Sequence, residues 1–260
     1  MRTFLAGTLI LSLFFLSACE NKHVIIIAGS TSVQPYAELL AEEFMTLNPE
    51  IIIDIQGGGS SAGITAVESG TAAIGMSSRS LKDAEQHLWS VEIVKDGLAM
   101  IVNPGNPVQN LSLAQIRGVY TADIKNWKEL GGEDAKIHII AREEGSGTRT
   151  AFEDLVMDGQ RINPRAIVQN SNGAVRQLVA GDQRSIGFIS LGLVDETVKA
   201  LQLDGVAATS GNIGDGGYSL FRSFLFVAKD KPTGDAMKFI DFIFSMEGRK
   251  LMAEEGLIIE

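Results

Sequence analysis

The sequence predicts an α/β protein with a mostly parallel β-sheet, and three observations support that class. Short apolar runs rich in β-branched residues alternate with segments whose apolar residues recur at helical spacing. A loop rich in glycine, serine or threonine separates several of these runs from the helical segment that follows. Hydrophobic residues make up 45% of the 260 residues and charged residues 21%, which is the composition of a folded globular protein.

The first 19 residues have the features of an export signal. Arg2 supplies a positive charge, and the apolar run at 4–16 is too short for a comfortable transmembrane span. The sequence LSAC at 16–19 resembles a bacterial lipobox, in which the cysteine is lipidated and becomes the mature N-terminus. We therefore expect a signal peptide at 1–18, a lipidated tether at 19–23, and an exported protein anchored to the bacterial cell envelope through Cys19. An uncleaved anchor and an ordinary signal peptide are the alternatives.

The first part of the mature chain repeats strand, loop and helix. Its strands are β-branched runs of the kind that form buried parallel strands, and its helices show one apolar face. The predicted elements are a strand at 24–28, a helix from Tyr36 to Leu47, a strand at 51–55, a helix through Ile64 and Val67 that ends at Gly70, and a strand at 72–76.

A second α/β unit follows a strand at 97–102, over which the chain is expected to cross. The predicted elements of this unit are helices at 111–119 and 126–130, a strand at 137–141, a helix with its apolar stripe at 151–156, a helix at 172–179 and a strand at 185–189. A long strand at 219–228 is placed to carry the chain back to the first unit. An amphipathic helix at 236–252 completes the predicted fold.

Three loops share one chemistry: GSTS at 29–32, GSSAG at 59–63 and GSGT at 145–148. Each follows a predicted strand and opens a predicted helix, where backbone N–H groups are free and the helix dipole is positive. Glycine lets a ligand approach the backbone, and serine and threonine add O–H donors. The three loops together predict a cradle for a small oxyanion. The alternative for any single loop is simple N-capping of its helix.

Two arginines lie beside these loops in the sequence. Arg79 follows the third strand, and Arg142 precedes the GSGT loop. Arginine makes bidentate, charge-assisted hydrogen bonds to tetrahedral oxyanions, although an isolated arginine more often forms a surface ion pair. The formal net charge of −10 argues against nucleic acid as a partner, but it does not exclude a small anion that is recognised locally.

Four stretches resemble the phosphate-binding proteins of phosphate ABC transporters, the PstS-like family. They are GSTSVQP at 29–35, GGGSSAGI at 57–64, IGMSSR at 74–79 and AREEGSGTRTAF at 141–152. The resemblance covers essentially the whole mature chain and implies a two-lobed periplasmic-binding-protein type II fold. Each lobe would be a mixed sheet flanked by helices, with the ligand cleft between them. We expect lobe 1 at 24–100 and 219–260, and lobe 2 at 101–218.

The same resemblance implies a function. It predicts a solute-binding lipoprotein rather than an enzyme, a monomer that closes on inorganic phosphate and delivers it to an ABC transporter permease. No cofactor or metal is expected, and no metal-type spacing of cysteine and histidine occurs. Glu144 matches the acidic position that orients the family's arginine. The implied ligand-binding residues are Thr31, Ser32, Ser60, Ser78, Arg79, Arg142, Ser146, Gly147 and Thr148.

One departure from the family pattern bears on selectivity. Many members have an aspartate after the third strand, which accepts a proton from phosphate, whereas this chain has Ser78. Fully ionised sulfate needs no such acceptor. Binding of sulfate, molybdate or tungstate therefore remains an alternative to binding of phosphate.

A less favoured alternative is a secreted serine hydrolase. The sequence GSSAG at 59–63 also fits the G-x-S-x-G nucleophile elbow, with Ser61 as the nucleophile. The elbow predicts a histidine base late in the chain, but the three histidines are His23, His87 and His138. None of them follows the elbow in the expected context, so the sequence favours the binding protein.

Overall fold

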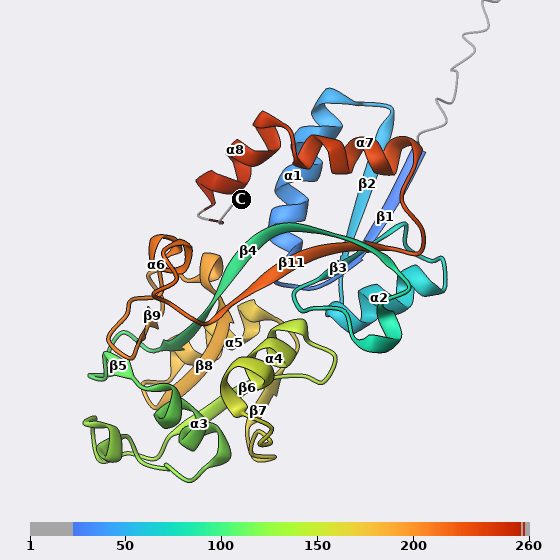
Figure 1. Cartoon of the computed structure of the whole chain (residues 1–260). Helices are drawn as coiled ribbons and strands as arrows, with labels where there is room; N and C mark the ends of the chain where they lie inside the picture. The colour runs from blue at the N-terminus through green and yellow to red at the C-terminus, as the bar shows by residue number, and fades with distance from the viewer. Residues whose placement is uncertain (1–22, 256, 258–260) are drawn as a thin grey trace, which may run out of the picture.

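The computed structural model describes residues 23–255 and 257. The predicted signal peptide at 1–18, Cys19 and the rest of the tether up to residue 22 lie outside the described residues. Two lobes are joined by two long strands, β4 (Trp89–Val102) and β11 (Phe221–Ala228), which run antiparallel between them (Figure 1). Within the described part of the chain, no helix is long and apolar enough to cross a membrane.

A sheet with the strand order β2-β1-β3-β11-β4-β8-β6-β7 extends through both lobes. In lobe 1, β1 (His23–Gly29) pairs in parallel with β2 (Ile51–Gly57) and β3 (Ile74–Ser77), and β11 adds antiparallel to β3. The sheet of this lobe is therefore mixed, as the family resemblance implies.

Strand β4 belongs to both lobes. Its first part, 89–97, pairs with β11, and its last part, 98–102, pairs with β8 (Ser185–Ser190). Strand β6 (His138–Arg142) lies parallel to β8 and to the edge strand β7 (Ile167–Gln169). The α/β class and the two-lobed architecture are thus confirmed.

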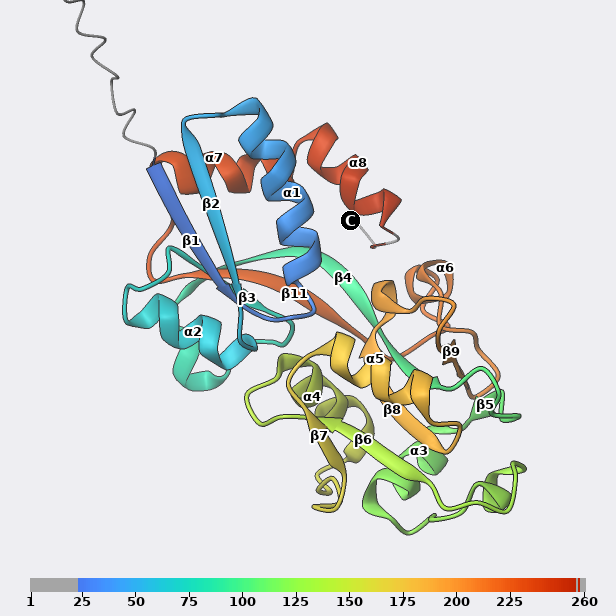
Figure 2. The same ribbon diagram turned by 180° about the vertical axis from the view of Figure 1, so that it is seen from behind.

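Helices cover both faces of the lobe 1 sheet. On one face lie α1 (Gln34–Leu47), α7 (Gly234–Ile243) and α8 (Met246–Glu254) (Figure 2). The core beneath them contains an aromatic pair, Phe44 and Phe239, whose ring centroids are 5.3 Å apart. On the other face, α2 (Ser60–Glu68) buries Ile64 and Val67 against Leu88 and Val227. Burial of these apolar side chains is the main stabilising contribution in this lobe.

Lobe 2 is built in the same way. One face of its sheet packs against α3 (Leu113–Thr121) and α4 (Gly147–Phe152), with Phe152 stacked on Phe188 at 4.2 Å. The other face packs against α5 (Asn172–Gly181) through Val175 and Val179. The remaining elements are short: β5 (Asn110–Leu111), β9 (Lys199–Ala200), β10 (Gln202–Leu203), α6 (Ser210–Gly214), a π-helical turn Glu153–Met157, and 3₁₀ turns Asp83–Glu85, Trp127–Leu130 and Leu191–Leu193.

Several predicted elements differ from the observed ones. The single helix expected at 236–252 is two helices, because the Ser245 hydroxyl accepts a hydrogen bond from the N–H of Gly248 and starts α8 afresh. The strand expected at 97–102 begins at Trp89, and the helix expected at 126–130 is a 3₁₀ turn. The apolar core divides along β4, between Val94 in lobe 1 and Leu98 in lobe 2. The exact lobe boundaries stay a prediction.

Candidate anion-binding site

The three predicted loops meet between the lobes. The Ser32 hydroxyl lies 2.7 Å from that of Thr148, and the Ser61 N–H donates to the Gly145 carbonyl at 3.1 Å. We call the assembled side chains the hydroxyl cluster. It consists of Ser30, Thr31, Ser32, Ser60, Ser78 and Thr148.

A side-chain cap at the N-terminus of the following helix is present in only one of the three loops. The Ser146 hydroxyl accepts a hydrogen bond from the N–H of Arg149 and so caps α4. The first turns of α1 and α2 have no side-chain cap, although serine and threonine precede or begin both helices. The hydroxyl groups of these two loops are therefore directed to the cluster rather than to their own helices.

At Gly147, the first residue of α4, the backbone of this helix lies close to lobe 1. A Cβ atom at this position would lie 2.2 Å from the Ser60 hydroxyl oxygen and 2.6 Å from that of Ser78. Any side chain would push the GSGT loop away from lobe 1. The glycine is thus required by space, not by backbone conformation.

Arg142 brings a buried cation to the cluster. It is 1% exposed, and its Nη2 donates to the Thr31 hydroxyl at 3.2 Å. Its Nη1 is buried and has no hydrogen-bond partner among the described residues. A buried guanidinium N–H without a partner is costly, and an oxyanion is the ligand that would satisfy it.

The carboxylate that orients Arg142 is Glu143, and the prediction of Glu144 is corrected. Glu143 accepts from Nε of Arg142 at 2.9 Å and from Nη2 at 3.0 Å. Glu143 follows strand β6 directly and is half-buried beside the guanidinium, whereas Glu144 lies one residue further along and is exposed.

Arg222, which lies outside the predicted set, also reaches the cluster, and Asp96 pairs with it. Arg222 on β11 donates to the Ser32 hydroxyl at 3.3 Å, and its Nη2 lies 2.9 Å from a carboxylate oxygen of Asp96 on β4. Burial raises the pKa of Asp96 to about 6, against the lowering effects of the Arg222 charge and the Ser190 hydrogen bond. Arg222 is the one charged residue of β11, but β4 holds Glu92 and Lys95 as well as Asp96, so the sequence alone does not single out this pair.

Asn172, the first residue of α5, is the second unpredicted residue that contacts the cluster. Its Nδ2 donates to the hydroxyls of Ser32 at 2.9 Å and Thr31 at 3.4 Å, and its Oδ1 accepts from the N–H of Ser190 at 3.2 Å. It therefore joins lobe 2 to the first loop of lobe 1. The sequence placed it only at the start of a predicted helix.

Comparison with known proteins agrees with this geometry. Residues 17–247 match the family model described as PBP superfamily domain. The phosphate-binding protein PstS of Bacillus subtilis is 33% identical over 238 residues, which cover 89% of this chain and 79% of that protein. The chain belongs to the PstS family.

Solved structures from this family match over nearly the whole chain. A substrate-binding protein assigned to phosphate ABC transport, from Clostridium perfringens and with bound phosphate, has a TM-score of 0.89 and 43% identity, covering 92% of this chain and 100% of that one. An ABC-type phosphate transport receptor from Vibrio cholerae has a TM-score of 0.76 and 40% identity, covering 91% and 100%.

Arg79 takes a different place from the other site residues predicted in this PstS-family chain. Its guanidinium forms a bidentate pair with Glu85 at 2.7 and 2.8 Å, and this hydrogen bonding lowers the pKa of Glu85. Its Nη2 also donates to the Ser61 hydroxyl at 3.4 Å. No hydrogen bond described for residues 23–255 and 257 joins the Arg79 guanidinium to the hydroxyl cluster. Its role in ligand binding stays a prediction.

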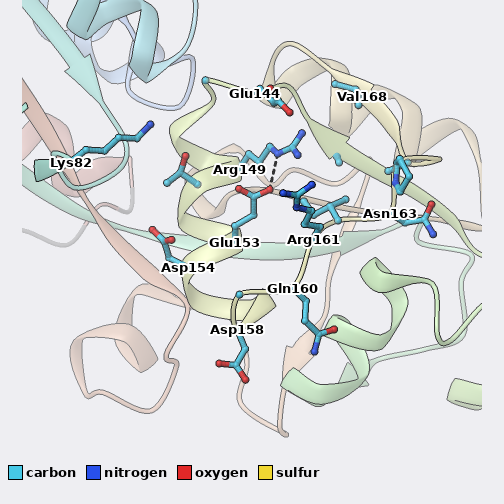
Figure 3. A pocket seen from close by; sticks show the side chains of 17 residues that line it. Lys82, Glu144, Arg149, Glu153, Asp154, Asp158, Gln160, Arg161, Asn163 and Val168 are labelled. Carbon is cyan, nitrogen blue, oxygen red and sulfur yellow. Dashed lines mark hydrogen bonds and ion pairs between the residues drawn. The ribbon is translucent and has the colours of Figure 1, made fainter. Parts of the chain in front are cut away.

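A large cavity is lined by residues of the GSGT loop, of α4 and of the segment that follows it, among them Gly145, Arg149 and Glu153 (Figure 3). Its volume of about 1020 Å³ is far greater than a tetrahedral oxyanion needs. Arg149 lines it, pairs with Glu153 at 2.9 Å, and donates to the backbone carbonyl of Arg142 at 3.0 Å. Arg149 therefore supports the end of the strand that carries Arg142.

The hydrolase alternative lacks a base near Ser61. The three histidines pair elsewhere, His23 with Asp235, His87 with the Ala84 carbonyl and His138 with Asp182. In the part of the chain that the structure describes, no group of three His, Cys, Asp or Glu side chains could hold a metal ion.

Proposed function

We propose that this chain is the solute-binding protein of a phosphate ABC transporter and that it captures inorganic phosphate between its two lobes. The observation that carries the proposal is the hydroxyl cluster, drawn from both lobes, around two buried arginines. Arg142 and Arg222 each have guanidinium N–H groups without a partner among the described residues. The bound phosphate of the Clostridium perfringens relative supports phosphate as the ligand.

Binding would rest on many donors rather than on net charge. Each arginine at or beside the cluster is paired with a carboxylate: Arg142 with Glu143, Arg222 with Asp96, and Arg79 with Glu85. The side chains around the ligand therefore add little net charge, and their N–H and O–H groups would replace the water lost by the anion. The N-terminus of α2, which has no side-chain cap, would add backbone donors.

The residues proposed to contact phosphate come from both lobes. They are Thr31, Ser32, Ser60, Ser78, Arg142, Ser146, Gly147 and Thr148, with Arg79 beside them. Ser78 would act in place of the aspartate found in many family members. Its hydroxyl oxygen already accepts from Ser30 at 2.8 Å and keeps a second lone pair for a protonated phosphate oxygen.

Delivery to the permease would use the two-lobed architecture. Strands β4 and β11 would bend as the lobes open and close, and the closed monomer would dock on the permease. The protein itself would have no enzymatic activity. We also propose export and lipid anchoring at Cys19, which would keep the protein at the membrane that holds its permease.

The remaining candidate is a binding protein for another oxyanion. It is favoured by Ser78, which stands where many family members have an aspartate. Isothermal titration calorimetry of ligand-stripped protein against phosphate, sulfate and molybdate separates the two. We expect heat of binding with phosphate and at least about 100-fold weaker binding of the other two anions, because two lost or mismatched hydrogen bonds to charged groups cost about 3 kcal/mol or more. Tighter binding of sulfate or molybdate would refute phosphate as the ligand.

A further inference from the structure

We propose that lobe 2 carries a second ligand site, for an organic anion with an apolar body, in a cavity at the β6–β7 edge of its sheet. The cavity has a volume of about 590 Å³, which suits a small organic molecule better than a bare inorganic ion. It is lined by residues from three segments of the chain, 121–125, 136–139 and 163–167. No member of the hydroxyl cluster lines it, so the inference goes beyond the proposed function.

The cavity lies where strand β6 extends past the start of its neighbour. Strand β7 pairs only with residues 140–142 of β6, so among the described residues the beginning of β6 has no partner strand on this side. The segment that follows α3 and the loop that precedes β7 complete the lining. Arg142 lies at the other end of β6, four residues and about 13 Å along the strand from His138, so both sites can be occupied at once.

Hydrogen bonds hold the three segments in place. The Ile137 N–H donates to the Lys125 carbonyl at 2.9 Å, and the Asn163 N–H donates to the Tyr120 carbonyl at 2.8 Å. The Asn163 side chain in turn accepts from the N–H of Arg165 at 2.8 Å. The cavity is therefore built into the fold, and a ligand would not have to order its walls.

Each segment contributes isoleucine to the lining of the cavity. Ile137 is buried in the core of lobe 2, and Ile124 and Ile139 pack against that core. Ile167, from the third segment, is 48% exposed. The apolar body of a ligand would remove these side chains from water, which favours binding.

Each segment also contributes one cation to the lining: Lys125, Lys136 and Arg165. Among the described residues, none of these three side chains has a hydrogen-bond or ion-pair partner. No carboxylate of the described residues lines the cavity, although the formal net charge of the protein is −10. Three uncompensated positive charges around an apolar surface favour a ligand that carries a negative charge.

The other charged groups on or beside these segments already have partners. His138, which also lines the cavity, is hydrogen bonded to Asp182 through Nδ1 at 2.5 Å. Asp123 accepts from the Thr121 hydroxyl at 2.7 Å, and Glu129 accepts from two backbone N–H groups at 2.9 and 3.1 Å. The three cations are therefore available to a carboxylate, sulfonate or phosphate ester on an aromatic or aliphatic body.

The test is a fluorescence titration of the purified protein with anilinonaphthalene sulfonate, an aromatic anion, at saturating phosphate. We expect one saturable site, from which decanoate displaces the dye and inorganic sulfate does not, because only decanoate has an apolar body. In Lys125→Glu/Lys136→Glu, dye binding should weaken at least about tenfold. Lys229→Glu/Lys231→Glu is the matched control, because it makes the same change of charge at exposed lysines outside the cavity.

A second pair of variants tests the apolar part of the site. Ile167→Asp should weaken dye binding at least about threefold, because it removes exposed apolar surface and adds a negative charge. Val168→Asp is its control, because Val168 is 52% exposed but lines the cavity of the GSGT loop instead. Both side chains lie on the surface, so we expect both variants to fold.

Wild-type dye binding in Lys125→Glu/Lys136→Glu or in Ile167→Asp would overturn the inference. An equal loss in either control, or the lack of a saturable site in wild type, would also overturn it. Weaker dye binding with phosphate than without it would mean that the dye competes for the site between the lobes, and the inference would again fail. Failure of wild type to bind phosphate would instead refute the proposed function and leave this site unaffected.

Discussion

At the residue scale, Arg142 and Glu143 form the pair on which the site is built. The guanidinium is buried at the end of β6, and Glu143 holds two of its nitrogens, so that the remaining Nη1 is directed away from the pair. A buried arginine is tolerated only when its charge and its donors are compensated. The neighbouring Glu144, which the family motif predicted as the orienting residue, is exposed, and the carboxylate bonded to the Arg142 guanidinium is that of Glu143.

The two glutamates give a matched test of this assignment. Glu143→Ala leaves the buried Arg142 without its carboxylate and should lower the free energy of unfolding by about 1–3 kcal/mol. Glu144→Ala removes an exposed side chain and should change it by less than about 0.5 kcal/mol. Urea unfolding followed by circular dichroism measures both. Equal effects of the two substitutions would argue against Glu143 as the orienting residue.

Gly147 offers a second test at this scale. In Gly147→Ala, the new methyl group would overlap the Ser60 and Ser78 hydroxyls when the lobes are closed, at a cost of about 1–3 kcal/mol. We expect phosphate binding at least about tenfold weaker than wild type by calorimetry. Gly173→Ala is the control, because a Cβ there would meet its nearest neighbour at 4.0 Å. Wild-type affinity in Gly147→Ala would show that the loop does not approach lobe 1 this closely.

At the element scale, the strand–loop–helix repeats were predictable because their signals are local. β1, α1, β2 and α2 each carry an apolar run or an apolar face within a few residues. Strands such as β7 and β9 are two or three residues long and are defined by their partners, so no local pattern marks them. The helix break at Ser245 was missed because the apolar spacing continues through it.

The residues of the candidate site also fall into two groups, those with a local sequence signal and those defined by long-range contacts. The three loops, with Arg142 and Thr148, could be found from motifs, because each motif directly follows an apolar run that is itself recognisable as a strand. Asp96, Arg222 and Asn172 could not, since their contacts depend on the pairing of β4 with β11 and on the position of α5 against lobe 1. These contacts join residues far apart in the sequence, so no short stretch of sequence marks them.

The strand pair β4–β11 carries a pH prediction. Burial raises the pKa of Asp96 from its ordinary value of 3.8 to about 6, so between these pH values the folded state binds more protons than the unfolded state does. The contribution of Asp96 to stability is therefore complete below about pH 4 and is lost as the pH rises through about 6, with a total on the order of 3 kcal/mol. The difference in unfolding free energy between wild type and Asp96→Asn, followed from pH 4 to pH 7, measures it. A difference that does not change with pH would contradict the raised pKa.

At the scale of the whole molecule, the net charge of the protein has the same sign as the charge of the anion that it is proposed to bind. The formal net charge is −10, yet the carboxylates at the cluster serve to hold arginines, and the more distant ones are screened by salt. Recognition therefore depends on donors that two lobes bring together, and the two lobes share one continuous sheet through β4. Closure and binding are one event in this account, because the proposed donors come from both lobes.

The most direct measurement is a phosphate titration of the Arg142→Ala variant, with its folding checked by circular dichroism. Arg142→Ala should weaken phosphate binding at least tenfold, since charge-assisted hydrogen bonds contribute about 1.5–3 kcal/mol each. Arg176→Ala, which removes an arginine of the same lobe that pairs with Asp195 outside the cluster, should leave the affinity unchanged. An Arg142→Ala protein that titrates with phosphate as wild type does would contradict the central claim.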